Sequence, residues 1–146
     1  MTLQNLLKIQ SLVPFTAQRD DIQRLLIAAV RNLDDAAVTA ISDENRFDAA
    51  YKCVMQCAMA SLMANGYRTS KSKPGHHQTA IQTLPLTVGV DAGTVIVLDG
   101  LRKQRNINDY DGEPISPTLV DECIKQAHAL LAHVRQWLAV HHPEFC

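Results

Sequence analysis

Apolar residues recur with helical spacing along most of this chain. Between residues 22 and 40 they fall three or four positions apart over five turns, and the ranges 47–62 and 120–138 carry similar stripes. This spacing places the apolar side chains on one face of a helix, where they can be buried against neighbouring helices. The pattern therefore predicts three long amphipathic helices.

Signals for the beginning and end of a helix flank these stripes. Ser42 precedes the second stripe and Asn65-Gly66 follows it, whereas Ser116-Pro117 opens the third stripe and Pro143 follows it. Serine caps the free N–H groups of a first helical turn, proline is tolerated in that turn, and an Asn-Gly pair suits a helix C-terminus. The boundaries of two of the long helices are therefore predicted as well.

Weaker patterns predict the remaining elements. Residues 2–8 and 76–84 are expected to form short helices, the second of them stopped by Pro85.

The run Val95–Val97 is β-branched, as strands often are, but it is short and has no obvious partner. Its apolar positions continue along 94–108 at helical spacing, so we expect a fourth long helix and no sheet.

Four long helices joined mostly by short turns predict an all-α fold, an up-and-down antiparallel helical bundle of four main helices plus short helices. The 146 residues are enough for one domain with a real core, so we expect a single domain spanning residues 1–146. Hydrophobic residues make up 47% of the chain and charged residues 20%, which is typical of globular proteins and argues against disorder.

The net charge of −1 produces no overall field that would attract nucleic acid, so any such contact must come from a local patch. The four cysteines lack the paired spacing of a disulfide framework, and Cys53 and Cys57 fall on the apolar stripe as small packing residues. No signal peptide or long apolar run is evident. We therefore expect a cytoplasmic protein without a membrane segment.

The stretch from Leu101 to Asp111 concentrates hydrogen-bonding side chains at the end of a helix. Arg105 can hold a phosphate with two parallel hydrogen bonds, and Asn106 can orient it. Tyr110 can donate a hydrogen bond or stack on a base, and Asp109 is a ligand-binding candidate that could act as a base. Alternatively, Arg105, Asp109 and Tyr110 form a polar network that locks the helix end against its neighbour. The sequence leaves both interpretations open.

This stretch resembles the end of the third helix of HEPN-domain proteins, the higher eukaryotes and prokaryotes nucleotide-binding family. Ribonuclease members carry an Arg, often followed by Asn, and then a His four to six residues beyond the Arg. Arg105 and Asn106 fit this pattern, whereas Tyr110 stands where the His is expected. Further similarities extend the resemblance to roughly residues 15–140, and they are carried by Ala50-Tyr51, Gly66-Tyr67 and Gly75-His76-His77.

The resemblance implies a helical bundle that usually forms a homodimer, with Arg and His of the motif meeting at a cleft shared by both protomers. Some family members are ribonuclease toxins or defence nucleases, others are partners of small nucleotidyltransferases, and others have no active site. A tyrosine side chain titrates near pH 10 and is a poor base near neutral pH. The favoured interpretation is therefore a non-catalytic HEPN-like module that binds RNA, a nucleotide or a nucleotidyltransferase-type partner.

The alternative is a metal-independent HEPN endoribonuclease that acts as a toxin or defence effector, with an antitoxin as its partner. In that case His76 or His77 could supply the base that position 110 lacks, although both also suit an exposed helix start. Adjacent histidines do not easily face one ion, and no Cys or carboxylate lies at zinc-site spacing around them. We therefore expect no metal and no cofactor.

Two further groups of residues are weaker candidates. Arg135 with His141 or His142 repeats the spacing of the motif, but it lacks the following Asn and suits a solvated helix end. Several cations also lie close in sequence to Arg105 or to the two histidines, and they could form a basic patch near the cleft. Of these cations, Arg102 is a candidate ligand-binding residue. These cations are Arg68, Lys71, Lys73, Arg102 and Lys103.

Overall fold

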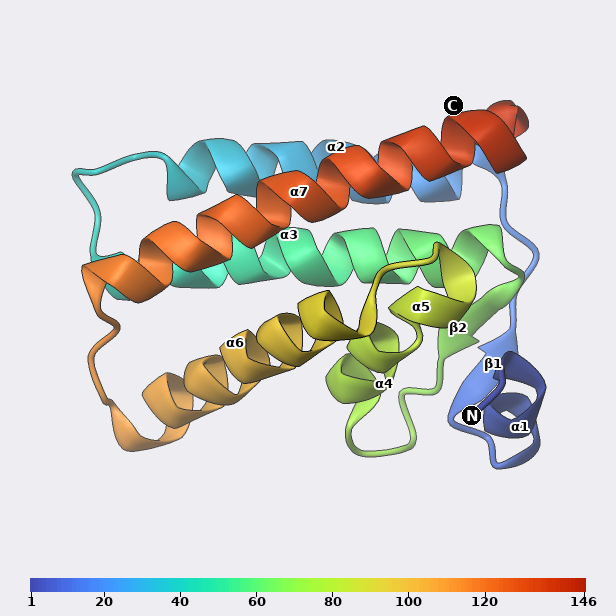
Figure 1. Cartoon of the computed structure of the whole chain (residues 1–146), viewed down its shortest axis with the longest axis horizontal. Helices are drawn as coiled ribbons and strands as arrows, with labels where there is room; N and C mark the ends of the chain where they lie inside the picture. Colours follow the sequence, from blue (N-terminus) through green and yellow to red (C-terminus); the bar gives the residue numbers. More distant parts are fainter.

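The computed structural model describes all 146 residues and is an up-and-down antiparallel helical bundle (Figure 1). Its long helices are α2 (Arg19–Ala36), α3 (Asp43–Ala64), α6 (Ala92–Asp111) and α7 (Pro117–His141). Its short helices are α1 (Leu3–Lys8), α4 (His76–Gln82), α5 (Leu84–Thr87) and the 3₁₀ helix η1 (Pro143–Phe145). The predicted bundle of four main helices plus short helices is confirmed.

Side-chain caps begin three of the long helices. The hydroxyl of Ser42 accepts a hydrogen bond from the backbone N–H of Asn45 at 3.2 Å, and Ser116 does the same for Leu119. The carboxylate of Asp91 caps α6 through Thr94 in an equivalent way. These contacts satisfy N–H groups that have no partner inside the helix, as the sequence signals at Ser42 and Ser116 predicted.

Helix α3 is the centre of the core. It packs against α2, α7 and α6, and Figure 1 shows it lying between α7 and α6. Phe47, Tyr51 and Val54 are each exposed by about 1%, and most other side chains of α3 are buried too. A helix covered on nearly every side is apolar nearly all round, which is why α3 has a broader buried surface than a single stripe.

Helix α6 is the most loosely packed of the long helices. Only Leu98 and Leu101 are buried along its 20 residues, and it lies mainly against α3 and α4. Val95–Val97 belongs to this helix, as predicted. Since its C-terminal half is not covered by α7, polar side chains there remain accessible to solvent.

The expectation that the chain has no sheet was wrong. Strand β1 (Leu12–Pro14) pairs with β2 (Tyr67–Thr69) in an antiparallel sheet of two strands, with Leu12 opposite Thr69 and Pro14 opposite Tyr67. Strands of three residues are too short to show an alternating pattern. Their pairing depends on the turn after α3, which returns the chain to its N-terminal segment.

Several helix ends also differ from expectation. Helix α2 ends at Ala36 rather than continuing to residue 40, and the next residues form an exposed turn. Pro85 lies in the first turn of α5 instead of simply stopping a helix. Proline is tolerated there because the N–H groups of a first turn need no partner within the helix. Asp111 is the last residue of α6, and Gly112, with a φ of 70°, ends that helix.

None of the helices combines the length and apolar character that crossing a membrane requires. Cys53, Cys57 and Cys123 are free and buried, whereas Cys146 is free and exposed. The buried thiols contribute small apolar surfaces to the packing of α3 against α7.

Candidate functional site

Six of the seven site residues chosen from the sequence line one open depression between α4 and α6, which we call the α4–α6 cleft. It has a volume of about 270 Å³. The beginning of α4 and the preceding residue contribute Gly75, His76, His77 and Gln78, and α6 contributes Arg102, Arg105, Asn106 and Tyr110. The seventh residue, Asp109, is not part of the lining, so the cleft wall contains cationic and neutral polar groups and no carboxylate.

Arg105 connects the cleft to α3. Its Nε donates a hydrogen bond to Oδ1 of Asp48 at 3.2 Å, and its Nη2 lies 3.6 Å from Oδ2 of Asp109. Its guanidinium carbon also lies 5.1 Å from the centre of the Tyr51 ring, within the range of cation–π attraction. The guanidinium is thus held in place, yet its side chain remains 26% exposed.

The polar network that the sequence allowed as an alternative for Arg105, Asp109 and Tyr110 forms only in part. Arg105 and Asp109 are paired, and Asp48 joins them from α3. Tyr110 forms no hydrogen bond and is 86% exposed. Its ring therefore stands at the edge of the cleft, free to contact a ligand.

Arg102 is held in a similar way one turn earlier. Its Nε donates to Oδ1 of Asp99 at 2.8 Å, and Nζ of Lys103 approaches the other oxygen of that carboxylate at 3.5 Å. The hydrogen bond from Arg102 lowers the pKa of Asp99, which therefore stays ionised. The cleft face of α6 thus carries two arginines, each positioned by a carboxylate that lies outside the cleft lining.

His77 is positioned by a buried tyrosine. The hydroxyl of Tyr51 lies 3.2 Å from Nδ1 of His77, and the ring of His76 packs edge-on against His77 at 4.6 Å. Burial, together with the nearby His76 and Arg105, lowers the pKa of His77. Burial also raises the pKa of Tyr51 to about 12, so its hydroxyl stays protonated. The result is a neutral imidazole beside a guanidinium.

Tyr51 was not chosen as a site residue from the sequence, where it belongs to the apolar stripe of α3. A signal was nevertheless present, because a buried tyrosine hydroxyl usually has a hydrogen-bond partner. Nothing in the sequence indicates that this partner is His77, which lies 26 residues away on another helix. The partner depends on how α4 packs on α3.

The weaker candidates lie elsewhere or are partly engaged. His141 stacks on Trp137 at 4.7 Å and His142 pairs with Glu144 at 2.8 Å, at the C-terminal end of α7. That end is opposite the C-terminal end of α6 (Figure 1). In the proposed basic patch, Nζ of Lys73 donates to the carbonyl of Ile9 at 2.7 Å, while Arg102 and Lys103 share Asp99. Three of these five cations, Lys73, Arg102 and Lys103, are therefore already engaged within the chain.

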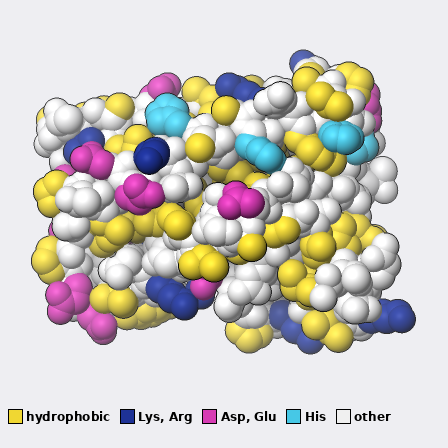
Figure 2. Space-filling model, in the orientation of Figure 1, with side chains coloured by type: hydrophobic (Ala, Val, Ile, Leu, Met, Phe, Trp, Pro, Cys, Tyr) yellow, Lys and Arg dark blue, Asp and Glu magenta, His cyan; other side chains and the backbone are white.

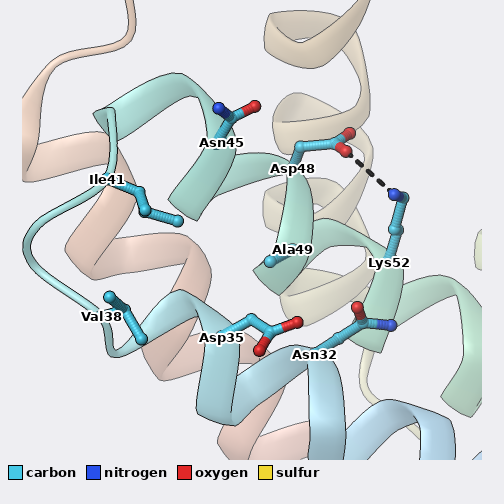
Figure 3. Close-up of a pocket in the computed structure, with 8 residues that line it drawn as sticks. All are labelled: Asn32, Asp35, Val38, Ile41, Asn45, Asp48, Ala49 and Lys52. Carbon is cyan, nitrogen blue, oxygen red and sulfur yellow. Dashed lines mark ion pairs between the residues drawn. The ribbon is translucent and has the colours of Figure 1, made fainter.

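A second depression, which we call the α2–α3 groove, has a volume of about 390 Å³ and lies between the C-terminal half of α2 and the N-terminal half of α3 (Figure 3). Its lining consists of Asn32, Asp35, Val38, Ile41, Asn45, Asp48, Ala49 and Lys52. Asp48 pairs with Lys52 at 3.3 Å as well as with Arg105. The sequence pattern did not indicate this groove, because its residues come from two helices and the turn between them.

No group of three or more His, Cys, Asp or Glu side chains lies close enough together to hold a metal ion. The lining of the α4–α6 cleft offers guanidinium groups that attract anions, amides and imidazoles that form hydrogen bonds, and an exposed aromatic ring.

Comparison with known proteins gives no match: no family model, no curated protein and no solved structure is significantly similar to this chain.

Proposed function

We propose that this protein is a non-catalytic HEPN-like module whose α4–α6 cleft binds a phosphate group of RNA or of a nucleotide. The observation that carries the proposal is the composition of the cleft lining. Two arginines, two histidines, an asparagine, a glutamine and a tyrosine share one surface, and no carboxylate is among them. Such a set of donors suits an anion better than a cation or an apolar ligand.

The two arginines retain hydrogen-bonding capacity for a ligand. A guanidinium has five N–H donors, and the contacts of Arg105 with Asp48 and Asp109 engage only part of them. A phosphate oxygen can therefore be bound without breaking the contacts that position the side chain. The exposed ring of Tyr110 offers a face on which a base can stack, which adds affinity without sequence selection.

Fluorescence anisotropy with a labelled single-stranded RNA and with a labelled nucleotide tests the proposal. We expect Arg105→Ala to weaken binding by roughly tenfold or more, because charge-assisted hydrogen bonds to phosphate contribute about 1.5–3 kcal/mol. Arg24→Ala is the matched control, since Arg24 is an exposed arginine of α2 that pairs only with Asp21. Equal losses in the two variants would mean that the cleft is not the binding site.

Circular dichroism of Arg105→Ala separates binding from folding. Arg105 is partly exposed and pairs with partly exposed carboxylates, so its loss should cost about 1 kcal/mol or less. The helical spectrum should be unchanged. A variant that unfolds outright would show that Arg105 mainly holds α6 against α3.

A second candidate function is metal-independent cleavage of RNA, which the position of His77 favours. A neutral imidazole in the cleft beside Arg105 could take the proton of a 2′-hydroxyl while the guanidinium stabilises charge on the phosphate. We expect little or no cleavage, since the motif position carries Tyr110. Incubation of single-stranded RNA in chelator compares the wild type with Arg105→Ala, Tyr110→Phe and His77→Gln. Robust wild-type cleavage that all three variants lose would overturn the non-catalytic proposal.

The proposed module is a homodimer. Helix α6 exposes Ile96 by 73%, Ile107 by 41% and much of Tyr110, and the spacing of Ile96 and Ile107 places them on one side of the helix. A second copy placed along α6 would bury these side chains and give the open cleft a second wall. The chain carries no nucleotidyltransferase signature, so a nucleotidyltransferase or antitoxin would act as a separate partner.

A further inference from the structure

Charge is strongly segregated along this chain. The segments 32–48 and 106–122 together hold ten of the 15 acidic residues and only one of the 14 basic residues, Arg46. Their net charge is −9, whereas the whole chain has a net charge of −1, so the remainder carries +8. The ten acidic residues are Asp34, Asp35, Asp43, Glu44, Asp48, Asp109, Asp111, Glu113, Asp121 and Glu122.

The fold brings both segments to the same end of the bundle, which we call the acidic end. The turn from α2 to α3 and the turn from α6 to α7 lie there together (Figure 1). Most of the acidic side chains on the face seen in Figure 2 lie in the half of the molecule that contains these turns. Segments separated by 57 residues of sequence therefore build one acidic surface.

Local helix stability accounts for only part of this distribution of charge, because Asp43 and Glu44 lie in the first turn of α3, where carboxylates are favourable, but other carboxylates lie at helix C-termini. Asp34 and Asp35 lie in the last turn of α2, and Asp109 and Asp111 in the last turn of α6, while neither turn contains a basic residue. The backbone dipole makes a helix C-terminus negative, so carboxylates at that end are unfavourable and cations would be favourable. Asp34, Asp35 and Asp111 also form no ion pair within the chain.

The α2–α3 groove lies at the acidic end and adds exposed apolar surface to it. Val38 is 45% exposed and Ile41 is 42% exposed, and Figure 3 shows both side chains at one end of the groove, with the carboxylate of Asp35 farther along it beside Asn32. The single cation of the lining, Lys52, is already paired with Asp48. Asp48 also pairs with Arg105, so the groove combines an apolar wall with one unpaired carboxylate, that of Asp35.

We propose that the α2–α3 groove docks a lysine- or arginine-rich segment of a partner protein. An aliphatic side chain of that segment packs on Val38 and Ile41, and its cations pair with Asp35 and the neighbouring carboxylates. Complementary charge accelerates association and excludes other partners, while the apolar contact supplies affinity. The unpaired carboxylate of Asp35 repels phosphate groups from the groove itself, so nucleic acid is not its occupant.

A second copy of this chain is a poorer occupant. The positive charge of the second copy lies outside its own acidic end. If that positive surface docked on the acidic end of the first copy, the contact would join two different surfaces head to tail. Contacts of that kind build open chains unless the rotation happens to close a ring. The groove and the α4–α6 cleft share no lining residue, although Asp48 of the groove accepts a hydrogen bond from Arg105 of the cleft. The proposal does not depend on what that cleft binds.

Selection from a pool of short peptides tests the proposal with the full-length protein. The first pool is built from Lys, Arg, Leu, Val and Ser, and a matched pool has Gln in place of Lys and Arg. We expect retention from the basic pool about tenfold or more above the neutral pool, falling steeply as salt is raised. Retention of both pools to the same extent, or of neither, would overturn the proposal.

Three variants locate the site for the selected peptides. Asp35→Asn and Ile41→Ser should each weaken binding by about fivefold or more, and only Asp35→Asn should reduce its dependence on salt. Asp20→Asn is the matched control, since Asp20 is an exposed carboxylate at the other end of α2. Equal weakening by Asp20→Asn would show a response to net charge alone.

Two competing occupants, a polyamine and a second copy of this chain, are tested in parallel. Evidence for either occupant would overturn the proposal. If spermine binds as tightly as the selected peptides, and if Ile41→Ser does not change spermine binding, the groove is a polyamine site. Sedimentation at low salt that shows species growing without limit as protein concentration rises would identify head-to-tail association through the acidic end.

Discussion

At the scale of single residues, Tyr51 organises the α4–α6 cleft from beneath. Its ring supports the guanidinium of Arg105 and its hydroxyl contacts Nδ1 of His77, while the residue itself is 1% exposed. One buried side chain on α3 thereby sets the positions of two groups that come from α6 and α4. We infer that Tyr51 is a positioning residue, since it does not line the cleft.

Tyr51→Phe should preserve the contact with Arg105 and remove the contact with His77. The loss of one hydrogen bond is expected to lower the free energy of unfolding by about 0.5–1.5 kcal/mol, as measured by urea denaturation. RNA binding should weaken only slightly, because the arginines stay in place. Tyr51→Leu, which also removes the aromatic face, should weaken binding further. Equal binding losses in the two variants would contradict separate roles for ring and hydroxyl.

The pKa of His77 gives the fold a dependence on pH. Folding lowers this pKa below its ordinary value of 6.5, so near that pH the unfolded chain binds a proton more readily than the folded protein does. The stability that depends on neutral His77 is therefore fully present above about pH 6.5 and is lost as the pH falls through the folded-state pKa. Acidification should destabilise the bundle.

Thermal unfolding followed between about pH 7.5 and 5.5 measures this effect. The wild type should lose more stability over this range than His77→Gln, which cannot titrate at that position. His128→Gln is a suitable control, because His128 is exposed on α7. Identical pH profiles for the wild type and His77→Gln would show that another group is responsible.

At the scale of elements, α6 presents the cleft because of how it is packed and where it ends. Positions 102, 106 and 110 are four residues apart and position 105 follows 102 by three, so these positions share one side of the helix. Gly112 ends the helix just after these residues, with a φ of 70° that glycine adopts at no steric cost. Gly100 lies inside the same helix, and a Cβ added to it would meet nothing within 4 Å.

Alanine at these two glycines should therefore have opposite effects. Gly112→Ala should destabilise the protein by about 1 kcal/mol, because a side chain disfavours the left-handed conformation that ends α6. Gly100→Ala should stabilise it by roughly 0.5–1 kcal/mol, because alanine loses less backbone freedom in a helix. Urea denaturation measures both changes. Stabilisation by Gly112→Ala would mean that α6 does not end as described.

At the scale of the whole molecule, the loose packing of α6 bears on assembly. The helix is held by α3 and α4 on one side and exposes apolar residues on another, whereas α3 is covered on nearly every side. Proteins rarely leave large contiguous apolar patches in contact with water unless a partner covers them. This asymmetry within the bundle supports the proposed homodimer.

Sedimentation equilibrium at micromolar concentration should give twice the chain mass of 16.1 kDa. Ile96→Glu is expected to shift the protein to monomer, because a charge would be buried in the interface. Ile27→Glu is the matched control, since Ile27 is 56% exposed on α2. A wild-type mass equal to one chain would contradict the proposal, as would dissociation by both variants.

The sequence by itself determined the helices and the residues of α6 that face the cleft. Ser42 and Ser116 cap helices through backbone groups three residues away, and the apolar stripes follow a period set by backbone geometry. Arg105, Asn106 and Tyr110 share a helix face for the same reason. These features could be predicted because the atoms that decide them are close together in sequence.

Only the tertiary structure decided which partners these residues have. The pairing of β1 with β2, the contact of Tyr51 with His77 and the bond from Arg105 to Asp48 join positions far apart in sequence. The acidic end likewise arises from two turns that the antiparallel topology brings together. Such contacts depend on how whole helices pack against one another, and a repeating pattern within one segment carries no information about the segment it meets.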